Sequence, residues 1–255
     1  MGCLAVMRLS ILETLRRKEF YVVLVLVFLL AIGMLITHPG GTGAGRFAKD
    51  VVMQVIWLAS FALCAPLAAR QIASDMEQKT VYVLMSRPIH RWQYVFGRTA
   101  GAAAASIICF VSMFAVLVTM LTLKHAGGIA DPSLWQAFAL QVVALVMLCS
   151  IAMLFSTSGT PAGAVTFSFI VVGVMRYAAG GLMQKITAME GFGRGMVWAL
   201  FVALPHFEFF NINQRTVHGW GPLPNTLFLQ VLAYGLVYSI FATAFASYLF
   251  KKRWL

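Results

Sequence analysis

Six apolar segments, each long enough to cross a lipid bilayer, constrain this chain more than any other feature of its sequence. The hydrocarbon core of a bilayer is about 30 Å thick and an α-helix rises about 1.5 Å per residue, so a spanning helix needs about 20 apolar residues. Each segment is bounded by charged residues, prolines or glycine-rich breaks. The predicted spans are residues 20–37, 50–70, 97–123, 135–156, 161–184 and 226–250.

Composition points to a membrane protein and excludes a soluble domain. Hydrophobic residues make up 61% of the 255 residues, and charged residues make up only 11%. Charged residues are about a quarter of a typical soluble domain. The apolar segments have helical length and lack the two-residue alternation of barrel strands. We therefore expect an all-α integral membrane protein, with one transmembrane domain over residues 1–255.

The basic residues predict the orientation of the chain. Of its 19 lysines and arginines, 12 lie before the first span, around segment 71–96 or after the last span, and six lie in the other loops. Cytoplasmic loops are enriched in basic residues. Both termini and segment 71–96 are therefore expected in the cytoplasm, and loops 38–49, 124–134 and 185–225 outside. The charges follow the spans and form no separate basic stripe, which argues against nucleic-acid binding.

The residues that precede the first span have an amphipathic pattern. Leu4, Ile11, Leu12 and Leu15 fall near one face of a helix, and most of the charged residues fall on the other. This pattern predicts a helix that lies at the cytoplasmic surface of the membrane. The alternative is a set of basic anchors that flank the first span.

The outer segment 185–225 is expected to contain a short helix. Residues 196–204 form an apolar run that ends at Pro205. Nine residues are too few to cross a bilayer, so the run predicts a re-entrant or interfacial helix.

Two pairs of glycines are spaced four residues apart near helix starts. Gly97 and Gly101 open the third span, and Gly159 and Gly163 lie at the start of the fifth. This spacing allows two helix backbones to approach closely, so we expect helix packing at both places.

The sequence lacks the groups that an ion-coupled carrier or a membrane enzyme needs. Such carriers keep an acidic residue within the membrane, and the six predicted spans contain none. No HExxH, GxSxG or paired-aspartate motif is present, so we expect no catalytic residue and no metal site. The glycine-rich run 40–46 lacks the Lys-Ser/Thr ending of a phosphate-binding loop. Any ATP must therefore bind to another chain.

Arg176 is the one charged residue deep inside a predicted span. It lies roughly eight residues, or about 12 Å at helical rise, from the outer end of the fifth span. Its side chain can reach towards the interface or pair with a backbone carbonyl. The alternative is that Arg176 lies on a substrate path.

The polar interval between the second and third spans carries the most specific pattern. It contains Asp-x-Glu-x-x-Thr at residues 75–80, Ser-x-Pro-x-x-Arg at 86–91, and Gly97-Arg98. The interval resembles the ABC transporter type-2 permeases, the membrane subunits of ABC exporters, where acidic residues, a Gly-Thr pair, a Ser/Thr-x-Pro-x-x-Arg stretch and Gly-Lys lead into the third helix. Asp75 replaces the commoner Glu, Lys79 replaces the usual Gly, and Arg98 replaces Lys.

The six-span layout, the amphipathic start and the basic end of the chain share this resemblance. It implies the permease of an ATP-driven exporter in the cell (inner or cytoplasmic) membrane, paired with a second copy or a related permease. The resemblance also implies that transport is driven by a cytosolic ABC ATPase subunit that binds ATP and Mg²⁺, while this chain binds no cofactor. The residues implied in the ATPase contact are Asp75, Glu77, Thr80, Arg87, Pro88, Arg91, Gly97 and Arg98.

Helical periodicity in the same interval supports a coupling helix. Ile72, Met76 and Thr80 recur at helical spacing, and Pro88 would interrupt the helix. We expect an amphipathic cytoplasmic helix within segment 71–96 that docks on the ATPase. A solvated loop with an interfacial helix and no partner is the alternative. At the level of function, an ion-coupled secondary transporter and a membrane scaffold or assembly factor stay open.

Overall fold

A computed structural model describes residues 2–15, 18–37, 42–81, 90–123, 131–177, 194–195, 198 and 204–252. These residues are helical with no strand, so the prediction of an all-α fold is confirmed. The helices are α1 (Gly2–Leu15), α2 (Lys18–Thr37), α3 (Thr42–Glu77), α5 (Arg91–Leu123), α6 (Pro132–Ser158), α7 (Pro161–Tyr177), η1 (Phe207–Phe210), α10 (Asn213–His218) and α11 (Asn225–Lys252).

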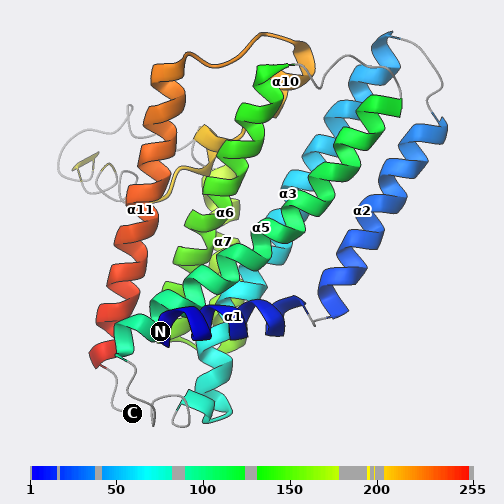
Figure 1. The fold of residues 1–255 in the computed structure, drawn as a ribbon. Helices are drawn as coiled ribbons and strands as arrows, with labels where there is room; N and C mark the ends of the chain where they lie inside the picture. Colours follow the sequence, from blue (N-terminus) through cyan, green and yellow to red (C-terminus); the bar gives the residue numbers. More distant parts are fainter. Residues whose placement is uncertain are drawn as a thin grey trace.

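The long helices form a bundle with a short helix across each end (Figure 1). Helix α6 packs against α3, α7 and α11, while α2 packs against α3 and α5. Helix α1 lies across one end of the bundle, and α10 lies at the other (Figure 1). We refer to these as the α1 end and the α10 end.

The long helices differ in how much of their apolar surface is buried, as expected of a helical bundle in a membrane. The buried share of the most apolar 18-residue stretch is 67% in α6 and 22% in α11. Helix α11 exposes large apolar side chains such as Val237, Ile240 and Phe241. Apolar surface of this extent suits a lipid environment and not water.

Four helices in the described part of the chain are long and apolar enough to cross a membrane, by length and composition. They are Lys49–Glu77, Arg91–Thr122, Pro132–Ser158 and Asn225–Lys252, and Pro161–Val174 is a shorter apolar helix. The four correspond to the predicted second, third, fourth and sixth spans. The predicted first span falls in α2, and the predicted fifth begins in α7, with residues 178–184 outside the described residues.

Helices α3 and α5 are longer than their predicted spans. Helix α3 starts at Thr42, so residues 42–49 of the predicted outer loop are helical, while the candidate span within α3 begins at Lys49, beside the predicted start at residue 50. The 36 residues of α3 and the 33 residues of α5 extend about 54 Å and 50 Å at helical rise. Both lengths exceed the roughly 30 Å hydrocarbon core, so each helix projects beyond it.

The outer segment contains two short helices that the sequence did not indicate. Most of the run 196–204, predicted as a re-entrant helix, lies outside the described residues. Helices η1 and α10 follow it, and η1 buries Phe207 and Phe210 against the bundle. Gly219 ends α10 in the left-handed conformation, with φ of 67°, which glycine adopts at low cost.

Candidate functional site

Helix α1 packs closely on the start of α5 over two glycines. A Cβ atom built on Gly101 would lie 2.5 Å from Ser10 Cβ and 2.9 Å from Met7 O, and one on Gly97 would lie 3.0 Å from Cys3 O. Neither position tolerates a side chain without movement of α1. The packing expected of this glycine pair is therefore confirmed.

The other glycine pair makes no close contact with a second helix among the described residues. Gly159 caps the C-terminus of α6, and a Cβ atom on Gly163 would meet only the Thr160 side chain within its own turn. The prediction for this pair was wrong because four-residue spacing acts only when both glycines lie on one helix.

The face that α1 turns to the protein is small and mostly polar. Val6, Ser10 and Thr14, spaced four residues apart, are buried. Leu4 and Leu12, on the apolar face seen in the sequence, are exposed. Helix α1 thus presents Leu4 and Leu12 away from the bundle, as expected of a helix that lies on a membrane surface.

Hydrogen bonds join α1 to the end of α3. Ser10 Oγ donates to Gln71 Oε1 at 2.5 Å, and Gln71 Nε2 donates to Thr14 Oγ1 at 3.2 Å. Thr14 Oγ1 in turn donates to Ser10 O at 2.8 Å. All three side chains are buried, and buried polar groups stabilise a structure only when they are paired in this way.

A second set of polar contacts joins α1, α3 and α5. Arg98 forms ion pairs with Asp75 Oδ2 and, at 2.9 Å, with Glu13 Oε2. Tyr94 Oη also donates to Asp75 Oδ2, and Thr80 Oγ1 donates to Asp75 Oδ1 at 3.2 Å. Both carboxylate oxygens of Asp75 are therefore engaged. We call Glu13, Asp75, Tyr94 and Arg98 the charged cluster.

Asp75, Tyr94 and Arg98 of the charged cluster are buried, whereas the Glu13 side chain at its edge is exposed, and this determines the energetic role of the Asp75–Arg98 pair. The Arg98 residue is 2% exposed and Asp75 is 8% exposed. Removing one partner of a buried ion pair costs about 3–5 kcal/mol, because the other charge stays buried without compensation. The cluster therefore stabilises one relative position of α1, α3 and α5, as long as Asp75 and Arg98 are both charged.

Helix α3 ends immediately after the cluster. It stops at Glu77, and Lys79 takes a φ of 58° in the left-handed region. Thr80 Oγ1 donates to the Asp75 carbonyl at 3.2 Å, which satisfies one of the open carbonyls of the last turn. The predicted helix of this segment is therefore interrupted at Gln78 and Lys79. Helical conformation resumes at Thr80 and Val81, and residues 82–89 lie outside the described residues.

An apolar cluster surrounds these polar contacts and extends to the end of α11. It includes the buried side chains of Val6, Ile72, Tyr94 and Phe250. The Tyr94 and Phe250 rings lie 5.5 Å apart, and Arg91 Nη1 donates to Lys251 O at 3.3 Å. Helices α1, α3, α5 and α11 thus meet at one end of the bundle.

The structure brings together four of the predicted contact residues. Asp75, Thr80, Gly97 and Arg98 all lie in the junction between α1, α3 and α5, where they make internal contacts. Four other predicted residues are placed differently. Glu77 is exposed at the end of α3, Arg91 is exposed beside α11, and Arg87 and Pro88 lie outside the described residues.

Arg176 lies in α7, one residue before its end at Tyr177, and the structure describes its backbone without its side chain. The two interpretations of Arg176 therefore stay open. Across the part of the chain that the structure describes, no group of three His, Cys, Asp or Glu side chains is arranged to hold a metal ion.

Sequence reasoning missed Glu13, Tyr94 and Gln71 as members of this junction. A signal for α1 was present in the four-residue spacing of Val6, Ser10 and Thr14, which marks a small face suited to helix packing. The leucine pattern drew attention to the opposite face. Tyr94 and Gln71 carry no local signal, because their roles depend on residues more than ten positions away.

Several apolar helices of spanning length and no strand among the described residues define a helical membrane protein. A model of the ABC-2 family transporter proteins matches residues 4–255, and the chain therefore belongs to that family. Members of the family are membrane permeases, the non-catalytic transport components of ABC transporters, and they generally associate with an ATPase subunit. No curated protein matches the chain.

Proposed function

We propose that this chain is the permease subunit of an ATP-driven exporter, and that it receives the motion of a cytosolic ABC ATPase at the α1 end of the bundle. The observation that carries the proposal is the charged cluster, which ties the end of α3 and the start of α5 to α1. Segment 71–96 connects these two helices. A displacement of that segment therefore acts on both helices and on α1 together.

The proposed topology has six spans with both termini in the cytoplasm of a cell with an inner membrane. The distribution of basic residues supports this orientation. Under it, Glu77 and Arg91 flank the segment that faces the ATPase, and both side chains are exposed. A soluble partner can reach them without disturbing the buried cluster.

The proposed cycle assigns chemistry and motion to different chains. The ATPase binds and hydrolyses ATP with Mg²⁺, and this permease, with a second copy or a related permease, forms the substrate path. ATP can drive the permease only if the ATPase contacts two permease conformations with different free energies. The exposed end of α3, adjacent to a buried ion cluster, provides a surface where such contacts can differ.

The ion-coupled carrier is the weaker alternative because of how Asp75 is bonded. A coupling acid must exchange its proton or ion with water during transport. Asp75 is buried, and its carboxylate is occupied by Arg98, Tyr94 and Thr80. A membrane scaffold without transport activity would not need an ATPase. Association of this chain with an ATPase would therefore distinguish a transporter from a scaffold.

Co-purification with the ATPase encoded nearest to this chain in its genome tests the proposal. Glu77→Ala removes an exposed charge and no packed side chain, so the permease should fold normally. We expect about tenfold weaker association, the equivalent of one charged hydrogen bond, together with loss of the stimulation of ATPase activity by the permease. Binding is measured by interferometry on permease in lipid nanodiscs.

Glu208→Ala is the control, because Glu208 lies in η1, which packs on α6 and α7 and belongs to a different part of the chain from segment 71–96. It should leave both association and stimulation unchanged. Equal behaviour of the two variants, with the ATPase bound as tightly as by the unmodified chain, would remove segment 71–96 from the interface and overturn the docking proposal.

A further inference from the structure

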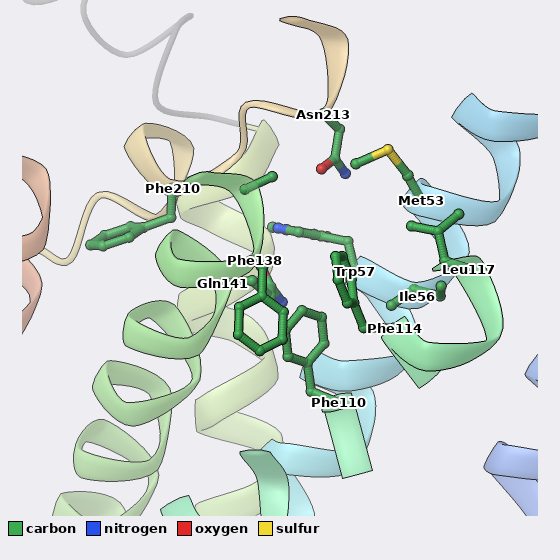
Figure 2. Close-up of a pocket in the computed structure, with 11 residues that line it drawn as sticks. Met53, Ile56, Trp57, Phe110, Phe114, Leu117, Phe138, Gln141, Phe210 and Asn213 are labelled. Atoms are coloured by element: carbon green, nitrogen blue, oxygen red, sulfur yellow. The ribbon is translucent and has the colours of Figure 1, made fainter. Parts of the chain in front are cut away.

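The hollow near the α10 end of the bundle is too small for a ligand. Trp57, Phe138, Gln141 and Asn213 are among the residues that line it, between α3, α5, α6 and α10 (Figure 2). Its cavity volume is ≈ 20 Å³, which is room for one or two waters. A more extensive site lies on the surface at the α1 end.

Basic side chains from two spanning helices meet at the α1 end. Helix α5 begins at Arg91 and α11 ends at Lys252, and the two helices pack together (Figure 1). Arg91 Nη1 donates to Lys251 O at 3.3 Å, so the positive charge of Arg91 lies beside the last turn of α11. Arg91, Lys251 and Lys252 are all exposed. Three positive charges therefore share one corner of the bundle.

Aromatic rings flank these basic side chains. Trp92 is exposed at the start of α5, and Tyr248 is exposed in the last turns of α11. The Lys252 Nζ atom lies 4.8 Å from the centre of the Tyr248 ring, a cation–π contact that favours this position of the ammonium group. Tryptophan and tyrosine next to lysine are typical of the level where lipid headgroups meet water. We call Arg91, Trp92, Tyr248, Lys251 and Lys252 the basic corner.

The two helices of the basic corner supply no carboxylate that would offset its charge. Neither α5 nor α11 contains aspartate or glutamate. Glu13 and Asp75 are engaged by Arg98. Glu77 is exposed on α3, which packs on α2, α5, α6, α7 and α10. The basic corner therefore carries a net positive charge and attracts anions.

The basic corner continues into an apolar surface that faces lipid. Phe241, Phe245, Tyr248 and Lys252 recur every three or four residues, so they lie along one face of α11, and all four are exposed. The Phe245 and Tyr248 rings are stacked at 6.5 Å between their centres. This face changes along its length from apolar to aromatic to cationic. A phospholipid has its parts in the same order, from acyl chains to an anionic phosphate.

We propose that the basic corner binds the headgroup of an anionic phospholipid. The lipid phosphate accepts hydrogen bonds from the ammonium groups of Lys251 and Lys252, and the acyl chains lie along Phe241 and Phe245. Arg91 contributes its charge from α5, so the bound lipid bridges α5 and α11. A soluble anion would gain the charge interaction without the apolar contact. A lipid gains both, and this favours a lipid as the ligand.

Native mass spectrometry of the delipidated permease tests the proposal. The probe is dioleoyl phosphatidylglycerol, and dioleoyl phosphatidylcholine is the comparison because it has the same chains and phosphate without a net charge. We expect phosphatidylglycerol to bind about tenfold more tightly. Lys251→Gln and Lys252→Gln should each weaken its binding about fivefold, the share of one basic residue, and leave phosphatidylcholine binding unchanged.

Lys18→Gln is the matched control, because it makes the same substitution at an exposed lysine of another helix. Lys18 lies at the start of α2, also at the α1 end, and α2 packs on α3 and α5 (Figure 1). This variant should bind phosphatidylglycerol as the unmodified chain does. Glycerol 1-phosphate, which has a phosphate and no acyl chain, should not displace the lipid.

The proposal is overturned if the two lipids bind equally well, because the charge would then have no part in recognition. It is also overturned if Lys18→Gln weakens binding as much as Lys252→Gln, which would indicate diffuse attraction to any basic residue at the membrane surface. Displacement by glycerol 1-phosphate would overturn it in favour of a soluble anion. The assay contains no ATPase and leaves Glu77 and Arg91 unchanged, so none of these results bears on the proposed coupling function.

Discussion

At the scale of single residues, Lys79 stands where the resembling permeases carry glycine, and the structure gives a reason for that glycine. Lys79 has a φ of 58°, a conformation that costs a residue with a side chain about 1–2 kcal/mol. The same residue follows the last turn of α3 and precedes Thr80, which bonds back to Asp75. The end of α3 is therefore held in place despite local strain.

Lys79→Gly should stabilise the protein by about 1 kcal/mol, because glycine adopts the left-handed conformation without a steric penalty. The melting temperature should rise by about 2–4 °C, as followed by tryptophan fluorescence in detergent micelles. Lys79→Ala is the control, since it removes the charge and keeps the strain. An equal rise in both variants would assign the effect to charge and not to the backbone.

At the scale of elements, the contact of α1 with α5 depends on backbone proximity. Gly101 and Ser10 approach so closely that a methyl group on Gly101 would lie 2.5 Å from the Ser10 Cβ atom. Ser10 also donates to Gln71, so a shift of α1 breaks its bond to α3 as well. A single added methyl group therefore acts on three helices.

Gly101→Ala should displace α1 from the bundle at a cost of about 1–3 kcal/mol, the usual range for overpacking. Amide hydrogen exchange in residues 2–15 should become faster, while exchange in α6 stays slow. Gly173→Ala in α7 is the control, because no atom of another described element lies within 4 Å of its added methyl group. Unchanged exchange in α1 would show that the helix accommodates the methyl group without moving.

The elements differ in how far the sequence could predict them. The apolar windows predicted the long helices because length and hydropathy are local properties. The start of α3 at Thr42 was missed because glycines favour a turn prediction, although here they begin a helix. The pairing of Asp75 with Arg98 and Glu13 arises from tertiary packing, and no pattern within one segment contains it. The positive φ of Lys79 could have been expected from the glycine of the resembling permeases.

At the scale of the whole molecule, the last helix closes the α1 end of the bundle. Phe250 is fully buried against Tyr94, and the adjacent Lys251 carbonyl accepts from Arg91. Most of α11 is exposed elsewhere. Its end is therefore a principal attachment of α11 to the junction around the charged cluster.

Phe250→Ala should destabilise the protein by about 3–5 kcal/mol, as expected for truncation of a buried phenylalanine. The melting temperature of the permease should fall by at least 6 °C in thermal unfolding. Phe245→Ala, on the same helix with 45% exposure, should have a much smaller effect. Similar losses for both would indicate that α11 contributes through its lipid-facing surface and not through this attachment.

Helix α5 runs without a proline from Arg91 to Leu123, and this continuity has a thermodynamic consequence. One helix carries Arg98 in the charged cluster and Phe114, whose ring packs against Phe110 and Phe138, about 24 Å apart at helical rise. A ligand that favours one rotation of this helix therefore shifts both side chains together. Linkage makes this influence reciprocal: a ligand that shifts ATPase affinity by some factor has its own affinity shifted by the same factor.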